Sequence, residues 1–375
     1  MIIDQLSIHM KIPYSEKLNT ASLARIFDNK SESYKLFWFK AILHEVGLGK
    51  NILSFQELIE RMIVDAWYMV SEYKLNLGPA DTLEKAVLYI SEKESFKPTE
   101  KEDVLISYLH NTEDKELRNF MKVLSLNVPY RLQAPLIPTP DTKLWYRTRA
   151  MADYINSQDG IMYVIEHRGA LDSRIIIDDN WMEYLLSNLA ILVGWTDYNL
   201  ITYLQRRNPT VPGISDKIYP PQERKLTAAT NYWKHLINTC EVRDIYTGEE
   251  LTSKDLSIDH FVPWSYVASD ELWNLIPTTK SVNSCKSNNL PDWDIYFGRL
   301  AKTEFEAYLT AENDETTERL FEKCAKENLN SDEVKYRLYK PGQTEQHFTN
   351  QLEEIMLPVY ESARNMGFCK WVYEL

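Results

Sequence analysis

A proline-rich stretch divides this sequence. Residues 208–222 read NPTVPGISDKIYPPQ, with four prolines and one glycine among fifteen residues. Proline lacks a backbone N–H and disfavours helical geometry in the residue before it, so neither a helix nor an inner strand can run through this segment. At 375 residues the chain is also longer than one ordinary hydrophobic core supports. We therefore expect two domains, 1–207 and 223–375, joined by a linker at 208–222.

The domain before this linker is predicted to be mostly helical. Ser54 and Glu57 form a capping box, and apolar residues follow at helical spacing from Phe55 to Val70. Four prolines at 127–141 predict an extended connection, because they exclude regular helix. Two β-rich runs predict a hairpin at 161–178. Further helices are predicted at 82–91, 100–110, 113–125 and 180–193, the last ending at Gly194.

The second domain is predicted to combine a small β region with helices. The Thr247–Gly248 turn predicts a hairpin whose return strand is 257–261. A short helix is predicted to follow, capped by Thr278 or Thr279, which gives a ββα unit within a core at 240–291. Helices are predicted at 223–238, 293–310, 315–328 and 345–365. The expected fold is mainly α with this small embedded ββα unit, and α+β overall.

Residues 259–286 read DHFVPWSYVASDELWNLIPTTKSVNSCK and concentrate acid–base and metal-binding side chains. Asp259 and His260 are adjacent, so on a strand their side chains point to opposite faces. A neutral histidine can take a proton from water near physiological pH. A carboxylate oxygen from Asp259 and an amide oxygen from Asn283 suit a single Mg²⁺ or Mn²⁺ ion. The stretch therefore predicts a metal-dependent nuclease site.

Two further residues of this stretch have predicted roles. Asn274 carries both amide donors and an acceptor, with which it can fix the loop behind His260. Lys286 lies three residues after Asn283, on the same helical face, and is expected to meet a phosphate oxygen. We therefore count His260, Asn274 and Lys286 as candidate catalytic residues, and Asp259 and Asn283 as candidate metal ligands.

The spacing of these residues resembles the HNH endonuclease family. Asn274 follows His260 by fourteen residues and Asn283 follows it by twenty-three, which is similar to the family variant with asparagine at the last position. It also resembles the HNH domain of RNA-guided CRISPR effectors. The resemblance implies a ββα-metal fold and hydrolysis of DNA phosphodiester bonds with one divalent cation. It further implies that His260 is the general base and that Asp259 and Asn283 bind the metal.

Many HNH proteins hold their hairpin with a zinc ion bound by two CxxC pairs. Here Cys240 stands alone and position 243 is arginine, so no structural zinc is expected. The four cysteines have no CxxC pairing and are expected to be reduced thiols. Packing against the flanking helices must then support the ββα unit.

The net charge of −13 argues against a strongly nucleic-acid-binding surface. Two local stretches are basic, one at 131–149 and one at 206–225. The nucleic-acid-binding candidates are Arg206, Arg207, Arg224, Lys225 and Lys280. An alternative interpretation of equal weight is a solvated face with ordinary salt bridges.

The preferred hypothesis is a DNA endonuclease acting on double-stranded DNA in restriction or anti-phage defence. Residues 1–207 would then recognise DNA or a regulatory protein. One alternative is a non-catalytic nucleic-acid or protein adaptor on the same scaffold, which the acidic charge favours. Another is an RNase or toxin. The sequence shows no signal peptide and no apolar run of about 20 residues, so a cytoplasmic protein without a membrane span is expected.

Overall fold

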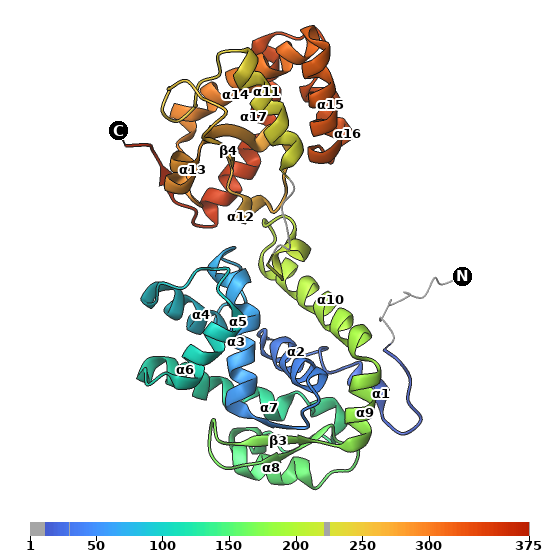
Figure 1. Cartoon of the computed structure of the whole chain (residues 1–375). Helices are drawn as coiled ribbons and strands as arrows, with labels where there is room; N and C mark the ends of the chain where they lie inside the picture. The colour runs from blue at the N-terminus through green and yellow to red at the C-terminus, as the bar shows by residue number, and fades with distance from the viewer. Residues whose placement is uncertain (1–11, 30, 221–225, 375) are drawn as a thin grey trace, which may run out of the picture. The chain divides into compact units, whose positions relative to one another are not determined.

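The computed structural model describes residues 12–29, 31–220 and 226–374. The chain forms two compact units. The first comprises Met1–Pro209 and Lys217–Pro220, and the second comprises Thr210–Asp216 and Pro221–Leu375. The chain therefore crosses between the units inside the proline-rich stretch. Helices dominate both units and the strands are short, so the fold is mainly α, and α+β overall (Figure 1).

Helix α3 (Phe55–Ser71) is the central helix of the first unit. Its capping box is present, with the Ser54 side chain accepting from the Glu57 N–H and the Glu57 side chain accepting from the Ser54 N–H. Most of its side chains are buried, because α3 packs against α2 (Tyr34–Gly47) and three other helices. Those three are α4 (Thr82–Lys93), α5 (Glu102–Asn111) and α6 (Lys115–Ser125).

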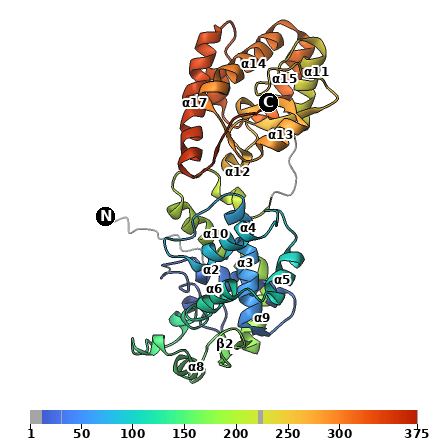
Figure 2. The ribbon, with the colours of Figure 1, turned by 90° about the vertical axis from the view of Figure 1, so that its left-hand side faces the viewer.

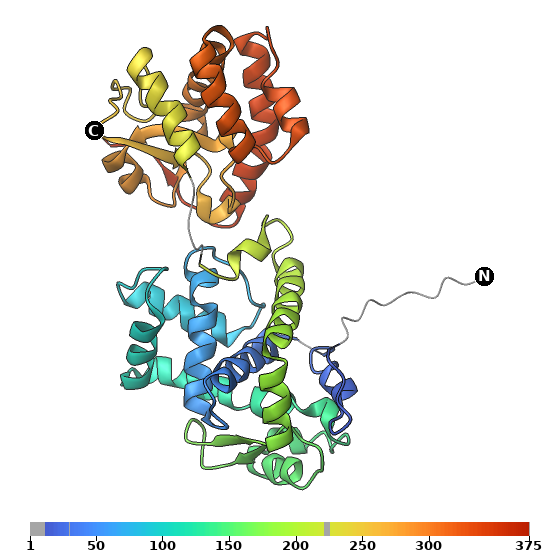
Figure 3. The same ribbon diagram turned by 45° about the vertical axis from the view of Figure 1, so that its right-hand side comes forward.

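The other helices of the first unit are short, except for α10 (Leu189–Arg207), which packs against α2 (Figure 3). Gly194 lies inside α10, so the predicted helix end there is wrong. The break falls at Asn188 instead, between α9 (Asp179–Ser187) and α10. The remaining helices are α1 (Thr20–Leu23), α7 (Val128–Arg131), η1 (Ala134–Leu136), η2 (Leu144–Tyr146), α8 (Thr148–Asn156) and η3 (Ile214–Lys217), which spans the unit boundary.

Segment 127–141 differs from the predicted extended connection. Pro129 lies in the first turn of α7, where its missing N–H removes no helical hydrogen bond. A three-stranded antiparallel sheet in the order β1-β3-β2 completes the first unit. Its strands are β1 (Ile52–Ser54), β2 (Tyr163–Glu166) and β3 (Arg174–Ile177), so β2 and β3 lie within the range 161–178.

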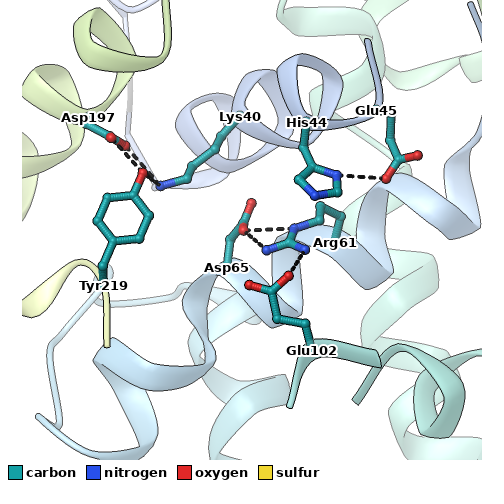
Figure 4. A network of polar contacts seen from close by, with 8 residues as sticks. All are labelled: Lys40, His44, Glu45, Arg61, Asp65, Glu102, Asp197 and Tyr219. Carbon is teal, nitrogen blue, oxygen red and sulfur yellow. Dashed lines mark hydrogen bonds and ion pairs between the residues drawn. The ribbon is translucent and has the colours of Figure 1, made fainter. Parts of the chain in front are cut away.

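A network of buried charges joins the helices of the first unit (Figure 4). Lys40 of α2 donates to Asp197 of α10 at 2.9 Å and to the hydroxyl of Tyr219 at 2.8 Å. Arg61 of α3 donates to Asp65 and to Glu102 of α5. The Lys40 and Arg61 side chains are only 10% and 9% exposed. The network therefore fixes how these helices pack.

In the second unit, long helices surround a small ββα unit (Figure 2). The ββα unit comprises β4 (Leu256–His260), β5 (Leu275–Thr279) and α13 (Lys280–Lys286). The strands β6 (Leu290–Pro291) and β7 (Lys370–Trp371) pair in parallel after it. The helices are α11 (Thr227–Thr239), α12 (Trp264–Val267), η4 (Leu272–Asn274), α14 (Trp293–Asn313), α15 (Glu315–Asn328), α16 (Asp332–Leu338) and α17 (Glu345–Asn365).

The predicted hairpin partner of β4 is wrong. A turn does form at Thr247–Gly248, where Gly248 has a φ of 76° and an isolated bridge joins Arg243 to Glu250. Strand β4 pairs with β5 instead, so that Pro277 lies opposite Ile258. Proline is tolerated there because the sheet has only two strands, and each has a free edge.

None of the helices in the described part of the chain is long and apolar enough to cross a membrane.

Candidate active site

The site is built at the end of strand β4. The register places Asp259 opposite Ile276 and His260 opposite Leu275, where both strands are buried. Helix α13 begins directly after β5, and the Thr279 side chain caps it by accepting from the Val282 N–H at 3.3 Å. Helix α13 packs against β4, so it contributes Asn283 and Lys286 beside the end of that strand.

Asp259 is 4% exposed, and both of its carboxylate oxygens are hydrogen-bonded. Oδ1 accepts from Lys286 Nζ at 3.1 Å, and Oδ2 accepts from the Tyr246 hydroxyl at 2.6 Å. Burial, together with the charge of Asp259, raises the pKa of Tyr246 well above its usual value. Tyr246 therefore stays protonated and donates to the carboxylate across the physiological pH range.

Lys286 is buried next to Asp259 and the backbone of His260. Its side chain is 1% exposed, and Nζ donates to Asp259 Oδ1 and, at 2.8 Å, to the backbone carbonyl of His260. This placement differs from the prediction that Lys286 meets a phosphate oxygen. The ammonium group ties the end of β4 to α13, and its charge offsets that of the buried Asp259 carboxylate.

His260 forms a close pair with Asp270. The distance between His260 Nε2 and Asp270 Oδ1 is 2.8 Å, and the two side chains are 6% and 23% exposed. Helix α15 holds the Asp270 backbone, because Asn328 Nδ2 donates to the Asp270 carbonyl at 2.9 Å. The carboxylate fixes the orientation of the imidazole and can stabilise the cation that forms when His260 takes up a proton.

Asn274 is fully buried in η4 and joins the segment after His260 to the start of β5. Its Oδ1 accepts from the Val262 N–H at 2.7 Å, and its Nδ2 donates to the Val262 carbonyl at 2.9 Å. Its backbone carbonyl accepts from the Phe261 N–H. The Asn274 side chain thus hydrogen-bonds both the N–H and the carbonyl of Val262, which lies beyond the end of β4.

Asn283 can supply an amide oxygen to a cation. Its Nδ2 donates to Ser257 Oγ at 2.8 Å and to the Ile258 carbonyl at 3.3 Å, so its acceptor oxygen takes no part in these bonds. Each carboxylate oxygen of Asp259 has two lone pairs and uses one of them for its hydrogen bond. Asp259 and Asn283 therefore each keep an oxygen lone pair that a hard divalent cation could use, with its other ligands from water or substrate.

Within the described ranges, no group of three or more histidine, cysteine, aspartate or glutamate side chains is arranged to hold a metal ion. Cys240 is an exposed free thiol, and Arg243 Nη1 donates to the Gly248 carbonyl at 3.1 Å. The turn at 243–250 is thus held by hydrogen bonds between its own residues.

The nucleic-acid-binding candidates are spread over the chain. Arg206 is exposed, and Arg207 donates to the carbonyl of Ser31 in the first unit. Lys280 is exposed at the first position of α13 in the second unit. Arg224 and Lys225 lie outside the described residues.

Two residues at the site are absent from the sequence-based prediction. Tyr246 lies in the turn segment before β4, and Asp270 lies in the loop that follows it, where the sequence shows no periodic pattern. Both contacts depend on the tertiary fold. The only sequence signal for Asp270 is a carboxylate in the loop between the histidine and Asn274.

Comparison with known proteins gives two findings. Residues 244–292 match the model of the HNH endonuclease family. The CRISPR-associated endonuclease Cas9 of Streptococcus mutans is 27% identical over 237 residues, which cover 55% of this chain and 17% of that protein. This chain therefore spans only a small part of the relative that it matches. No solved structure matches significantly.

Proposed function

Because residues 244–292 form an HNH endonuclease domain, we propose that this chain is a divalent-metal-dependent endonuclease that hydrolyses DNA phosphodiester bonds. One observation carries this proposal. His260, paired with Asp270, is adjacent to Asp259 at the end of β4, where α13 contributes Asn283. A proton acceptor next to two oxygen donors is what metal-dependent hydrolysis requires, and this supports the proposal.

Each residue has a separate role in this proposal. His260 takes the proton from the attacking water, and Asp270 keeps the imidazole oriented. Asp259 and Asn283 would hold one Mg²⁺ or Mn²⁺ ion, which when bound supplies positive charge to the scissile phosphate. Asn274 keeps the segment after His260 in place, and Lys286 holds β4 against α13.

Plasmid nicking tests the proposal. We expect the full chain to nick supercoiled plasmid with Mg²⁺ or Mn²⁺ and to be inactive in EDTA. His260→Ala should lower the rate by about 10²- to 10⁴-fold, the usual contribution of a general base. Asn283→Ala should weaken the activity that depends on the metal. His347→Ala, which removes an exposed histidine from α17, is the matched control and should leave the rate unchanged. Cleavage in EDTA, or full activity of His260→Ala, would refute the mechanism.

A second function, as a non-catalytic adaptor on the HNH scaffold, is favoured by the surroundings of Asp259. Both of its oxygens are engaged, and the Lys286 ammonium in contact with Oδ1 repels a divalent cation. An adaptor would bind DNA or protein without nicking under any metal condition. The same plasmid experiment therefore separates the two functions.

We further propose that the helical first unit recognises DNA or a regulatory partner, and that the chain acts in the cytoplasm in restriction or anti-phage defence. The net charge of −13 supports a requirement for recruitment, because an acidic chain is repelled by DNA. Comparing phage plaque formation on cells with the wild-type chain and with His260→Ala would test the defence role.

A further inference from the structure

The first unit contains a cleft of about 1030 Å³, at the upper end of the range for small-molecule sites. Three parts of the unit line it: the stretch that leads into α2, the segment around α7 and η1, and Trp145 of η2. The cleft is separate from the candidate nuclease site, which lies in the second unit.

The charge of this cleft is positive, in contrast to that of the whole chain. Its cationic side chains are Arg25, Lys35 and Arg131, and its acidic ones are Asp28 and Glu32. Asp28 pairs with Arg25 at 3.4 Å. Burial, and then the nearby charge of Asp81, raises the pKa of Glu32.

Arg207 adds a cation near the same cleft. Its guanidinium donates to the carbonyl of Ser31, a lining residue. Both basic stretches of the sequence, 131–149 and 206–225, therefore contribute arginine to this region of the first unit.

A flat, cationic aromatic surface forms one part of the cleft wall. The Arg131 guanidinium lies 5.0 Å from the centre of the Trp145 ring, and both residues are partly exposed. The next residue, Tyr146, is 84% exposed. Exposed tryptophan beside arginine is the surface on which nucleic-acid bases stack, and every base has a face that can use it.

The cations of this segment lack carboxylate partners. Among the described residues, no carboxylate lies within 4.0 Å of the side chains of Arg131, Lys143, Arg147 or Arg149. Arg168 of the same unit, by comparison, pairs with Glu166 at 2.6 Å. Ordinary salt bridges therefore do not account for the basic stretch at 131–149. These four cations make the segment locally positive in an acidic chain, and a local positive charge attracts anions.

We propose that this cleft binds a nucleotide, whose base stacks against the Arg131–Trp145 pair and whose phosphate lies near the lining cations Arg25 and Lys35. A nucleotide combines the two features that the cleft complements, a flat ring and an anion. The ligand is a residue of a single strand or a free nucleotide. This inference does not depend on nuclease activity, because no residue of the second unit takes part.

Fluorescence anisotropy with the full chain in EDTA tests this proposal, since EDTA prevents metal-dependent cleavage of the probe. The probe is a labelled single-stranded oligonucleotide of about 12 residues, within the usual site size for such proteins. Trp145→Ala should weaken binding about tenfold, the usual loss for one stacked base, and Trp145→Phe should restore part of it. Lys35→Gln, at a lining residue, should reduce the slope of log affinity against log salt concentration by about one.

Lys122→Gln is the matched control, because Lys122 is an exposed cation of α6 that lies outside the cleft. Its affinity should equal that of the wild type. Competition by a mononucleotide identifies a free nucleotide as the ligand, and competition by unlabelled strand alone identifies a strand. If the labelled oligonucleotide does not bind, or if all variants bind it with equal affinity, the proposal is overturned. If plasmid nicking fails while the Trp145-dependent binding persists, the proposed endonuclease function is refuted and the proposed nucleotide site is supported.

Discussion

The pair between His260 and Asp270 makes the base of the candidate site a two-residue unit. The carboxylate reaches the imidazole from a loop that is itself held by Asn328 of α15. A change at Asp270 therefore acts on His260 without touching Asp259 or Asn283. This separation allows the two halves of the site to be tested independently.

We expect Asp270→Asn to lower kcat for plasmid nicking by more than about tenfold while leaving KM unchanged. The amide keeps an oxygen near His260 Nε2 but lacks the negative charge that stabilises the protonated imidazole. Glu271→Gln is the control, because Glu271 lies in the same loop and accepts from Asn330. An equal loss in both variants would mean that the loop merely needs its carboxylates to fold.

Glu304 of α14 is an acidic side chain in the core of the second unit and is only 2% exposed. Its Oε1 has no hydrogen-bond partner in the described part of the chain, and burial raises its pKa well above 4.5. The folded state therefore binds a proton that the unfolded state has released, and stability falls as pH rises above 4.5. The free energy of unfolding falls by about 1.4 kcal/mol per pH unit until the pH reaches the pKa of Glu304 in the folded state.

Glu304→Gln removes this titration. We expect the variant to be more stable than the wild type at pH 8 and similar to it at pH 4, as measured by urea unfolding. Glu306→Gln, at an exposed position of the same helix, should change stability little at either pH. A Glu304→Gln variant that is less stable at pH 8 would show that the carboxylate is charged and paired in the folded state.

Only part of the site could be inferred from the sequence. The residues from Asp259 to Lys286 are close in sequence, and Thr279 does cap α13. Tyr246 and Asp270 are recognisable only once the strands are paired, because their partners are set by the fold. The burial of Lys286 could not be foreseen either, since a lysine near a nuclease motif is ordinarily assigned to phosphate.

Buried ion pairs on α2, α3 and α10 help to hold the helices of the first unit together (Figure 4). Lys40 joins α2 to α10 through its ion pair with Asp197. Burial alone would lower the pKa of Lys40, but the charges of Asp65 and Asp197 outweigh burial and raise it. The ammonium therefore remains charged at neutral pH, and its contribution to stability is lost only at strongly alkaline pH.

We expect Lys40→Met to lower the free energy of unfolding by about 3 kcal/mol at neutral pH, because it leaves the Asp197 carboxylate without its lysine partner. Urea unfolding, followed by far-UV circular dichroism, measures the change. Lys101→Met, at an exposed lysine before α5, is the control and should have little effect. If Lys40→Met lowers the free energy of unfolding no more than Lys101→Met does, water must replace the ammonium group.

Helices were more predictable than strand pairs because their signals are local. Helix α3 has its capping box, and α15 and α17 have the bounds expected from apolar spacing. The pairing of β4 with β5 was missed because Pro277 is a poor strand signal and the partner lies beyond a loop. Likewise, Pro129 does not break its segment but begins α7.

For the whole molecule, the division into two compact units sets how the chain should unfold. Lys40 is in one unit and Glu304 in the other, so each substitution reports on one unit. Sequence composition alone predicts neither this separation of effects nor the local basic cleft, because a net charge of −13 averages over both units.

We expect two calorimetric transitions at pH 8. Lys40→Met should lower the midpoint of one by several degrees, since about 1 kcal/mol shifts Tm by about 2–4 °C in units of this size. Glu304→Gln should raise the midpoint of the other. A single transition that both substitutions shift would show that the two units unfold together.

Strand β7 has a consequence for how the protein is made. Trp371 packs on the Tyr246 ring at 5.2 Å between centroids, and Tyr246 holds Asp259. Backbone pairing also joins β7 to β6, directly after α13. Trp371 leaves the ribosome later than any other residue of the site. A chain still being synthesised therefore carries an incomplete candidate site until translation has passed this strand.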